Sequence, residues 1–97
     1  KDDMLTIELQ NGEILIGGRF DASQTEKARS FLSAIETSMV VDMKNMEYIS
    51  SAGLGVLLMT QKRLHEAGCR LKLKNMSKHI RDVFMFSGFD QIFEIES

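Results

Sequence analysis

The feature that constrains the fold most is a nearly continuous apolar run, Met39-Val40-Val41-Asp42-Met43, which is rich in β-branched residues. A short run of this kind is typical of a strand buried on both faces, and such strands lie at the centre of a sheet. Soon afterwards, residues 51–67 repeat apolar side chains with the period of an amphipathic helix. A buried strand followed by a helix of more than ten residues is typical of an α/β domain.

Strand and helix patterns alternate along the rest of the chain. Asn11-Gly12 separates two stretches of alternating apolar residues and predicts a hairpin. Asp21 with Gln24 has the spacing of a capping box at a helix start, and Ser23 with Glu26 offers the same spacing. The expected elements are strands over 4–9, 13–19, 39–43, 69–74 and 91–95, and helices over 21–35, 51–67 and 77–87. The order β-β-α-β-α-β-α-β indicates an α/β fold with a mixed sheet.

The length, net charge and hydropathy of the chain exclude several classes of protein. We expect residues 1–97 to form a single domain, since most domains are of about this size. The net charge is −2 and no Lys/Arg run exceeds two residues, which argues against a nucleic-acid partner. No apolar stretch approaches the ~20 residues that would span a membrane. The single cysteine, Cys69, is compatible with a reducing compartment, so a cytoplasmic location is expected. The chain begins at Lys1, so a longer native protein is compatible with this sequence.

No set of residues with catalytic or metal-binding spacing occurs. His65 and His79 have no sequence neighbour that would make either a general base or a ligand, and both are interpreted as surface residues. Cys69 is interpreted as a small core thiol at the start of a buried strand. No Walker-type or GxGxxG phosphate loop is present. The sequence therefore predicts a protein that is not an enzyme and needs no cofactor or metal.

The stretch before the second helix is unusual. Ser50 and Ser51 stand where the helix should begin, and Gly53 and Gly55 follow within its first turns. Either serine would serve as an N-cap. A cap needs one hydroxyl, however, and the glycines would leave the serines reachable. A helix N-terminus also tolerates the roughly −2 charge of a phosphate. We therefore interpret the stretch as a docking site regulated by phosphorylation.

Three motifs in this chain resemble those of the STAS family, best known from bacterial anti-sigma factor antagonists. Val40-Val41-Asp42-Met43 is similar to the family's strand ending in Asp-Leu, which a short loop follows. Tyr48-Ile49 and then Ser50–Gly55 are similar to its aromatic-aliphatic pair and its Asp-Ser-Ser-Gly-Leu-Gly signature. Gly18-Arg19-Phe20-Asp21 resembles the Gly-x-Leu-Asp before its first helix, and 84–89 resembles its Phe-x-x-(Ser/Thr)-Gly-Leu.

The resemblance implies a STAS-like mixed sheet with helices packed mainly on one face, and a partner-switching function. Unphosphorylated antagonists bind an anti-sigma factor that is a serine kinase. The kinase phosphorylates the signature serine, which releases the complex, and a PP2C-type phosphatase restores the antagonist. By position the phosphoacceptor is Ser51, with Ser50 as the alternative because it replaces the family's aspartate; Ala52 replaces a second serine. The residues that the resemblance implies for partner binding are Asp21, Ser23, Ser50, Ser51, Gly53, Leu54 and Gly55.

The sequence is also compatible with other functions. The chain is alternatively a STAS interaction module of a larger transporter or sensor, or a subunit of a lipid-transport complex. A small hydrolase is disfavoured because no base lies near Ser51 in the sequence. Many family members continue into a fourth helix after the point where this chain ends, so this member is short or the chain is trimmed. Met85, Phe86 and Phe89 are expected to pack on the last strand, with a dimer contact as the alternative, so we expect a monomer or weak homodimer.

Overall fold

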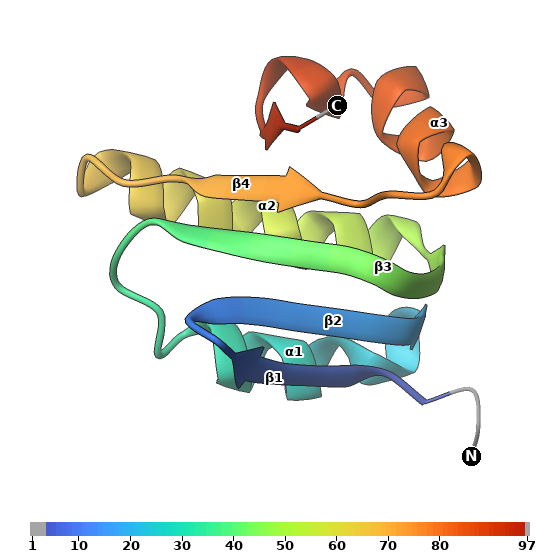
Figure 1. Cartoon of the computed structure of the whole chain (residues 1–97), viewed down its shortest axis with the longest axis horizontal. Helices are drawn as coiled ribbons and strands as arrows, with labels where there is room; N and C mark the ends of the chain where they lie inside the picture. The colour runs from blue at the N-terminus through green and yellow to red at the C-terminus, as the bar shows by residue number, and fades with distance from the viewer. Residues whose placement is uncertain (1–3, 97) are drawn as a thin grey trace.

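Five strands form one sheet in the order β1-β2-β3-β4-β5 in a computed structural model that describes residues 4–96 (Figure 1). β1 runs antiparallel to β2, whereas β2, β3, β4 and β5 pair in parallel. The strands are β1 Thr6–Gln10, β2 Glu13–Phe20, β3 Met39–Ile49, β4 Leu71–Lys74 and β5 Glu94–Ile95. The sheet is therefore mixed and β3 is its central strand, as the apolar run predicts.

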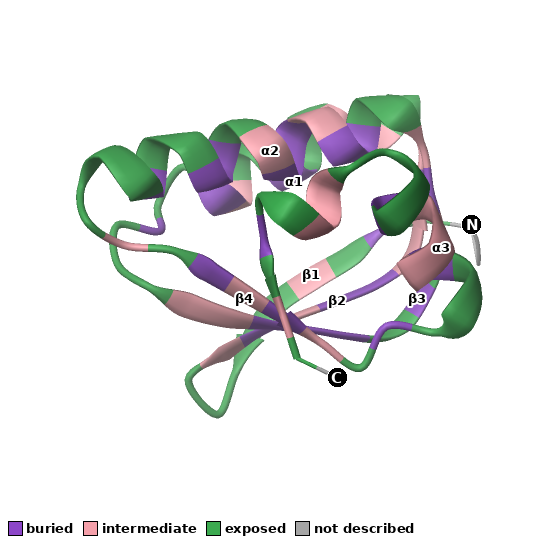
Figure 2. Cartoon of the chain, turned by 90° about the horizontal axis from the view of Figure 1, so that it is seen from above, coloured by how far each residue is buried: buried purple, intermediate pink, exposed green. Residues whose placement is uncertain are grey.

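The helices lie mainly on one face of this sheet. They are α1 Thr25–Leu32, α2 Ser51–Glu66 and α3 Lys78–Phe86, with short 3-10 turns η1 Ala22–Gln24 and η2 Phe89–Gln91. α1 and α2 lie side by side behind the sheet in Figure 1, and Figure 2 shows both on the same side of the strands. The element order and the one-sided packing confirm the expected fold class.

The core fills the space between the sheet and these helices. Ile14 of β2, Val41 of β3 and Leu73 of β4 lie in register across the sheet and are almost fully buried. Leu57 and Leu64 of α2 are buried with them, which follows from the apolar stripe of that helix. Side chains alternate along a strand, so the neighbouring row of Leu15, Asp42 and Lys74 points to the opposite face, which α1 and α2 leave uncovered.

The central strand is longer than expected. The sequence predicts a strand ending near Met43 and then a loop, but β3 continues to Ile49. β3 stays paired with β2 as far as Phe20↔Ile49, and two register shifts take up the extra residues of β3. Lys44 and Glu47 are exposed, so polar residues in this stretch mark bulges rather than a loop.

The last strands are shorter than expected. Cys69 precedes β4, which begins at Leu71, so its expected place in a strand is wrong, but the half-buried thiol does pack against the core. Gly88 takes a φ of 77° and leads into η2, so only Glu94 and Ile95 form β5. The backbone N–H of Phe93 donates to Phe89 O (3.0 Å), which places residues 89–93 in a turn.

The apolar residues near the end of α3 differ in whether they pack against the core. The Phe89 ring lies edge-on to Phe84 at 6.3 Å and 6.1 Å from Phe93, so Phe89 packs as expected. The side chains of Met85 and Phe86 are instead 52% and 88% exposed. The expectation of core packing is therefore wrong for these two residues.

Candidate phosphorylation and docking site at the start of α2

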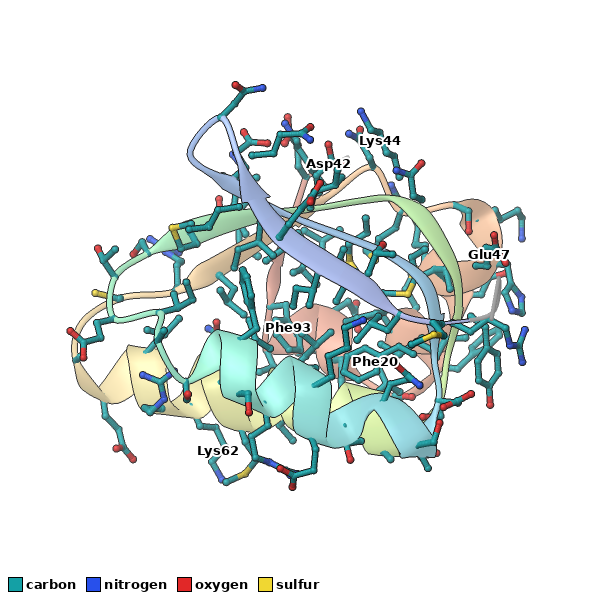
Figure 3. The ribbon with its side chains drawn as sticks, turned by 90° about the horizontal axis from the view of Figure 1, so that it is seen from below. Phe20, Asp42, Lys44, Glu47, Lys62 and Phe93 are labelled. Carbon is teal, nitrogen blue, oxygen red and sulfur yellow. The ribbon has the colours of Figure 1, made fainter. Side chains whose placement is uncertain are left out.

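The site forms where β2 and β3 end beside each other. Parallel strands bring their carboxyl ends to the same edge of a sheet, and Phe20 and Ile49 are the last paired residues. Phe20 is fully buried between the sheet and the helices (Figure 3). Its carbonyl oxygen accepts from the backbone N–H of Ser50 (2.9 Å). This bond ties the start of α2 to the turn that follows Phe20.

Ser50 is the N-cap of α2. Its hydroxyl accepts from the backbone N–H of Gly53 (3.0 Å) and donates to the carbonyl oxygen of Phe20 (3.0 Å). Its backbone is extended, as is usual for an N-cap. Serine and aspartate are both strong N-caps, so Ser50 performs the capping that an acid would perform at this position. An ionised aspartate, however, has no proton to donate to Phe20.

Ser51 is the first residue of α2 and is exposed. Its hydroxyl makes no hydrogen bond with any other residue of 4–96, and Ala52 beside it is also exposed. The first turn of α2 contains no acidic residue. The Ser51 hydroxyl therefore lies open to solvent at the helix end where backbone N–H groups favour an added anion.

Gly53 and Gly55 have different surroundings. A Cβ on Gly53 would lie 2.9 Å from both Cγ and the carbonyl oxygen of Phe20, and 3.1 Å from Cγ1 of Ile49. Gly53 is buried, so it permits α2 to pack closely on the strand ends. A Cβ on Gly55 would meet nothing within 4 Å. The expectation that both glycines open the surface is wrong for Gly53 and fits Gly55 alone.

Leu54 is only 6% exposed, so the expectation that it forms part of an exposed interface is wrong. It lies on the core-facing side of α2, where it packs with the other buried residues. Leu54 therefore packs in the core under the site and does not line its surface.

Asp21 and Ser23 lie beside the start of α2. Asp21 directly follows Phe20, and its carboxylate accepts from the backbone N–H (3.0 Å) and the hydroxyl (2.6 Å) of Ser23. Asp21 thus caps η1, a short turn that contacts α2. Neither expected capping box is formed, because the Gln24 side chain instead accepts from Leu5 N (3.4 Å) and the Ser23 hydroxyl donates to Asp21. Of the expected site residues, Ser23 and Ser51 are exposed, Asp21, Ser50 and Gly55 are half-buried, and Gly53 and Leu54 are buried.

Sequence reasoning missed one pair at the rim of this site. The guanidinium of Arg19 lies over the ring of Tyr48, 4.4 Å from its centroid, in a cation–π contact. Arg19 and Tyr48 are opposite each other in the β2–β3 register, one residue before Phe20 and Ile49. The pair could not be found from the sequence because a loop was expected where β3 continues.

Other candidate chemistry is sparse in the part of the chain that the structure describes. His65 and His79 are both exposed. No cluster of three or more His, Cys, Asp or Glu residues in 4–96 is placed to hold a metal ion. Within the same residues, no helix combines the length and apolar character that crossing a membrane requires.

Comparison with known proteins identifies related sequences. Residues 4–95 match the family model described as "Mlab, STAS domain". BtrV of Bordetella bronchiseptica, provisionally named an anti-sigma factor antagonist, is 33% identical over 97 residues, which cover 94% of this chain and 84% of the relative. The anti-sigma-B factor antagonist of Bacillus subtilis is 27% identical over 88 residues, 88% of this chain and 81% of the relative.

Solved structures show the same fold. The anti-sigma factor antagonist SpoIIAA in its unphosphorylated form superposes with a TM-score of 0.74 at 24% identity, over 96% of this chain and 88% of that one. The phosphorylated form of SpoIIAA, a Bacillus cell fate determinant, gives a TM-score of 0.68 at 23% identity, over 96% and 91% of the two chains.

Proposed function

The chain belongs to the STAS domain family, and on this premise we propose that it is an anti-sigma factor antagonist controlled by phosphorylation of Ser51. Two relatives carry the name of anti-sigma factor antagonist, and this chain covers 84% and 81% of their lengths. Both names describe regulators rather than enzymes. The corresponding role for this chain is to bind an anti-sigma factor and thereby release a sigma factor.

The observation that carries the proposal is that the hydroxyl of Ser50 is hydrogen-bonded within the fold, whereas the hydroxyl of Ser51 is exposed. Ser50 uses its hydroxyl both to accept from Gly53 N and to donate to Phe20 O. Phosphorylation of Ser50 would disrupt both bonds and the start of α2. Ser51 is exposed, and its hydroxyl makes no bond within residues 4–96. A kinase can therefore modify Ser51 while the fold stays intact.

The partner in this proposal is an anti-sigma factor that is itself a serine kinase. Its bound ATP would donate the γ-phosphoryl group: a bond forms between Ser51 Oγ and phosphorus, ADP leaves, and the hydroxyl proton passes to a base of the kinase. A PP2C-type phosphatase would return the serine by hydrolysis, releasing inorganic phosphate. Both partners come from the family resemblance, and SpoIIAA supports the cycle as a relative solved in unphosphorylated and phosphorylated forms.

Release follows from the charge placed at the interface. A phosphoserine adds a charge of about −1.5 to −2 at neutral pH. Within the antagonist, this charge is stabilised by the N-terminus of α2. Against a partner surface that fits a neutral hydroxyl, it adds desolvation cost and repulsion from acidic groups. Asp21 and Ser23, on the adjacent turn, would complete the contact surface.

The test is phosphate incorporation by the purified cognate anti-sigma factor kinase with ATP, with the modified residue mapped by mass spectrometry. We expect one phosphate, on Ser51, in the wild type and none in Ser51→Ala. Ser50→Asp is the matched control because it keeps an N-cap and removes the other hydroxyl. It should be phosphorylated on Ser51, whereas Ser50→Ala should lose about 1 kcal/mol of stability. Phosphate on Ser50, or on neither serine, would contradict the assignment.

The alternative is an interaction module that acts without phosphorylation. The family description names Mlab, and the sequence is compatible with a subunit of a lipid-transport complex or a module of a larger transporter or sensor. This alternative predicts that no kinase modifies Ser51 and that a partner binds Ser51→Asp as tightly as it binds the wild type.

A further inference from the structure

A groove lies between α1 and α2 on the exposed side of the helix pair. Its volume is about 370 Å³, and it is lined by Arg29, Ser33, Val56, Met59, Thr60 and Arg63. α1 and α2 lie side by side over the same face of the sheet (Figure 2). Lys62, one residue from the groove lining, points away from the sheet on this side of the molecule (Figure 3).

The middle of the groove is apolar and accessible. Met59 is 65% exposed, whereas Val56 beneath it is almost fully buried. Thr60 is polar, but its hydroxyl already donates to Val56 O (2.9 Å) within α2. Methionine is flexible and recurs at surfaces that adapt to a partner side chain. An apolar side chain of a partner protein could therefore pack on the exposed Met59 side chain.

The groove is also cationic. Arg63 donates to the carbonyl oxygens of Ile35 and Leu32, both at 2.9 Å, at and just after the C-terminal end of α1. These carbonyls carry only a partial negative charge, and within residues 4–96 no carboxylate pairs with Arg63. Arg29 pairs with Glu26 at 2.9 Å, but the two side chains are 59% and 85% exposed, so water weakens that pair. The lining set contains no carboxylate. A chain of net charge −2 thus presents two guanidinium groups around an apolar centre.

The groove is in line with Ala52, the residue after Ser51, while Ser51 itself lies about 80° around the axis of α2 from Met59. Ala52, Met59 and Arg63 are at helical positions i, i+7 and i+11, which fall within about 40° around the axis of α2. Met59 is eight residues after Ser51, or about 12 Å along the helix. An interface of ordinary size, about 800 Å² per partner, covers both positions.

We propose that the groove is a second contact for the protein that binds at Ser51, and that it receives an acidic segment with an apolar side chain at its centre. The apolar side chain packs on Met59, and carboxylates flanking it pair with Arg29 and Arg63. Charge complementarity selects an acidic segment, and the apolar centre favours a protein chain over a phosphate ligand. This inference rests on the proposed function, since it assigns the occupant to the same partner.

The test measures, by isothermal titration calorimetry, the binding of the cognate anti-sigma factor kinase to unphosphorylated antagonist. Met59→Glu and Arg29→Glu should each weaken binding at least about ten-fold, since a buried anchor or charge contact of this kind is typically worth a factor of ten. Leu9→Glu is the matched control: it makes the same change at another exposed apolar residue, on β1, and should leave affinity unchanged. Circular dichroism checks that each variant is folded, and Met59→Ala, which should lose affinity by a few-fold, keeps the test independent of the introduced charge.

The outcomes separate this inference from the proposed function. Unchanged affinity in Met59→Glu and Arg29→Glu, with phosphate still incorporated on Ser51, overturns the groove contact and leaves the function standing. Absence of phosphate on Ser51 overturns the proposed function first. Titration with ATP alone tests the other occupant: binding to the wild type that Arg29→Glu abolishes would assign the groove to a nucleotide and overturn a protein segment.

Discussion

Ser50 and Ser51 are adjacent in the chain but differ in what their hydroxyls touch. From the residue pattern alone either serine could cap the helix, and only the family resemblance favoured Ser51 over Ser50 as the phosphoacceptor. The assignment depends on Phe20, thirty residues earlier, whose carbonyl oxygen accepts from Ser50 Oγ. A contact of this range follows from strand pairing, which local residue patterns do not determine.

Gly53 and Gly55 provide a matched pair of substitutions. Gly53→Ala should destabilise the protein by about 1–3 kcal/mol, because its Cβ would meet Phe20 at 2.9 Å and one of those contacts is backbone. Gly55→Ala, in the same helix with nothing within 4 Å of its Cβ, should stabilise by about 0.5–1 kcal/mol through helix propensity. Urea unfolding of both variants measures the difference. Equal effects would show that Gly53 is not there for close packing.

The burial of Leu54 differs from what the sequence motif suggests. The motif placed it in the docking stretch, but the helix turns its side chain toward the core. The same helical period predicts this burial, since Leu54 lies in the apolar stripe with Leu57 and Leu64. Here the physical pattern was a better guide to exposure than the motif.

At the scale of elements, β3 is joined to the segment after β4 through Asp42. Asp42 is only 9% exposed, and its carboxylate accepts from Asn75 Nδ2 (3.0 Å) and from the backbone N–H of Lys44 (3.1 Å). Burial raises the pKa of Asp42, but these hydrogen bonds and the charges of Lys44 and Lys74 outweigh it, so the pKa is lowered overall. Asp42 therefore has a structural role on the sheet face away from α1 and α2.

Stability should accordingly depend on Asp42 in acid. A carboxyl whose folded-state pKa is below its unfolded value of 3.8 contributes stability above that pH and loses it as the pH falls through the folded-state pKa. Asp42→Asn should cost about 1–2 kcal/mol at pH 7. It should also flatten the fall in unfolding free energy below about pH 4. Denaturant unfolding at a series of pH values measures both effects.

Glu47→Gln is the control for that experiment. Glu47 lies on the same strand and is exposed (Figure 3). Its side chain makes no hydrogen bond with the rest of residues 4–96. Its substitution should leave the acid profile close to that of the wild type. A profile for Asp42→Asn that parallels the wild type would contradict the role assigned to Asp42.

Element types were predictable from periodicity, but some boundaries were not. The bounds of α2 and α3 were predicted to within a residue or two, because a serine precedes each helix and a glycine follows it. The helix expected over 21–35 is shorter: α1 covers Thr25–Leu32 and follows the 3-10 turn η1. β3 was missed beyond Met43 because its second half is rich in polar residues and carries two bulges. Residues 91–93 alternate like a strand, yet hydrogen bonds back to Gly88 and Phe89 hold them in a turn.

At the scale of the whole molecule, the residues that pack the core and the serine proposed to be phosphorylated lie in different parts of the fold. One face of the sheet is sealed by α1 and α2, and the ends of β2 and β3 hold the start of α2 against Phe20 (Figure 1). Ser51 lies on this hydrogen-bonded end of α2 rather than on a long loop. A phosphate there would change the charge of the docking surface without requiring the fold to rearrange.

The central claim is that phosphorylation of Ser51 releases the anti-sigma factor partner. The direct measurement is the dissociation constant of the cognate anti-sigma factor kinase, by isothermal titration calorimetry, for antagonist that is unmodified or fully phosphorylated on Ser51. We predict that the phosphorylated protein binds at least about ten-fold more weakly, because a charge of about −2 enters the interface. Circular dichroism spectra of the two forms should coincide. Equal dissociation constants for the two forms would contradict the account.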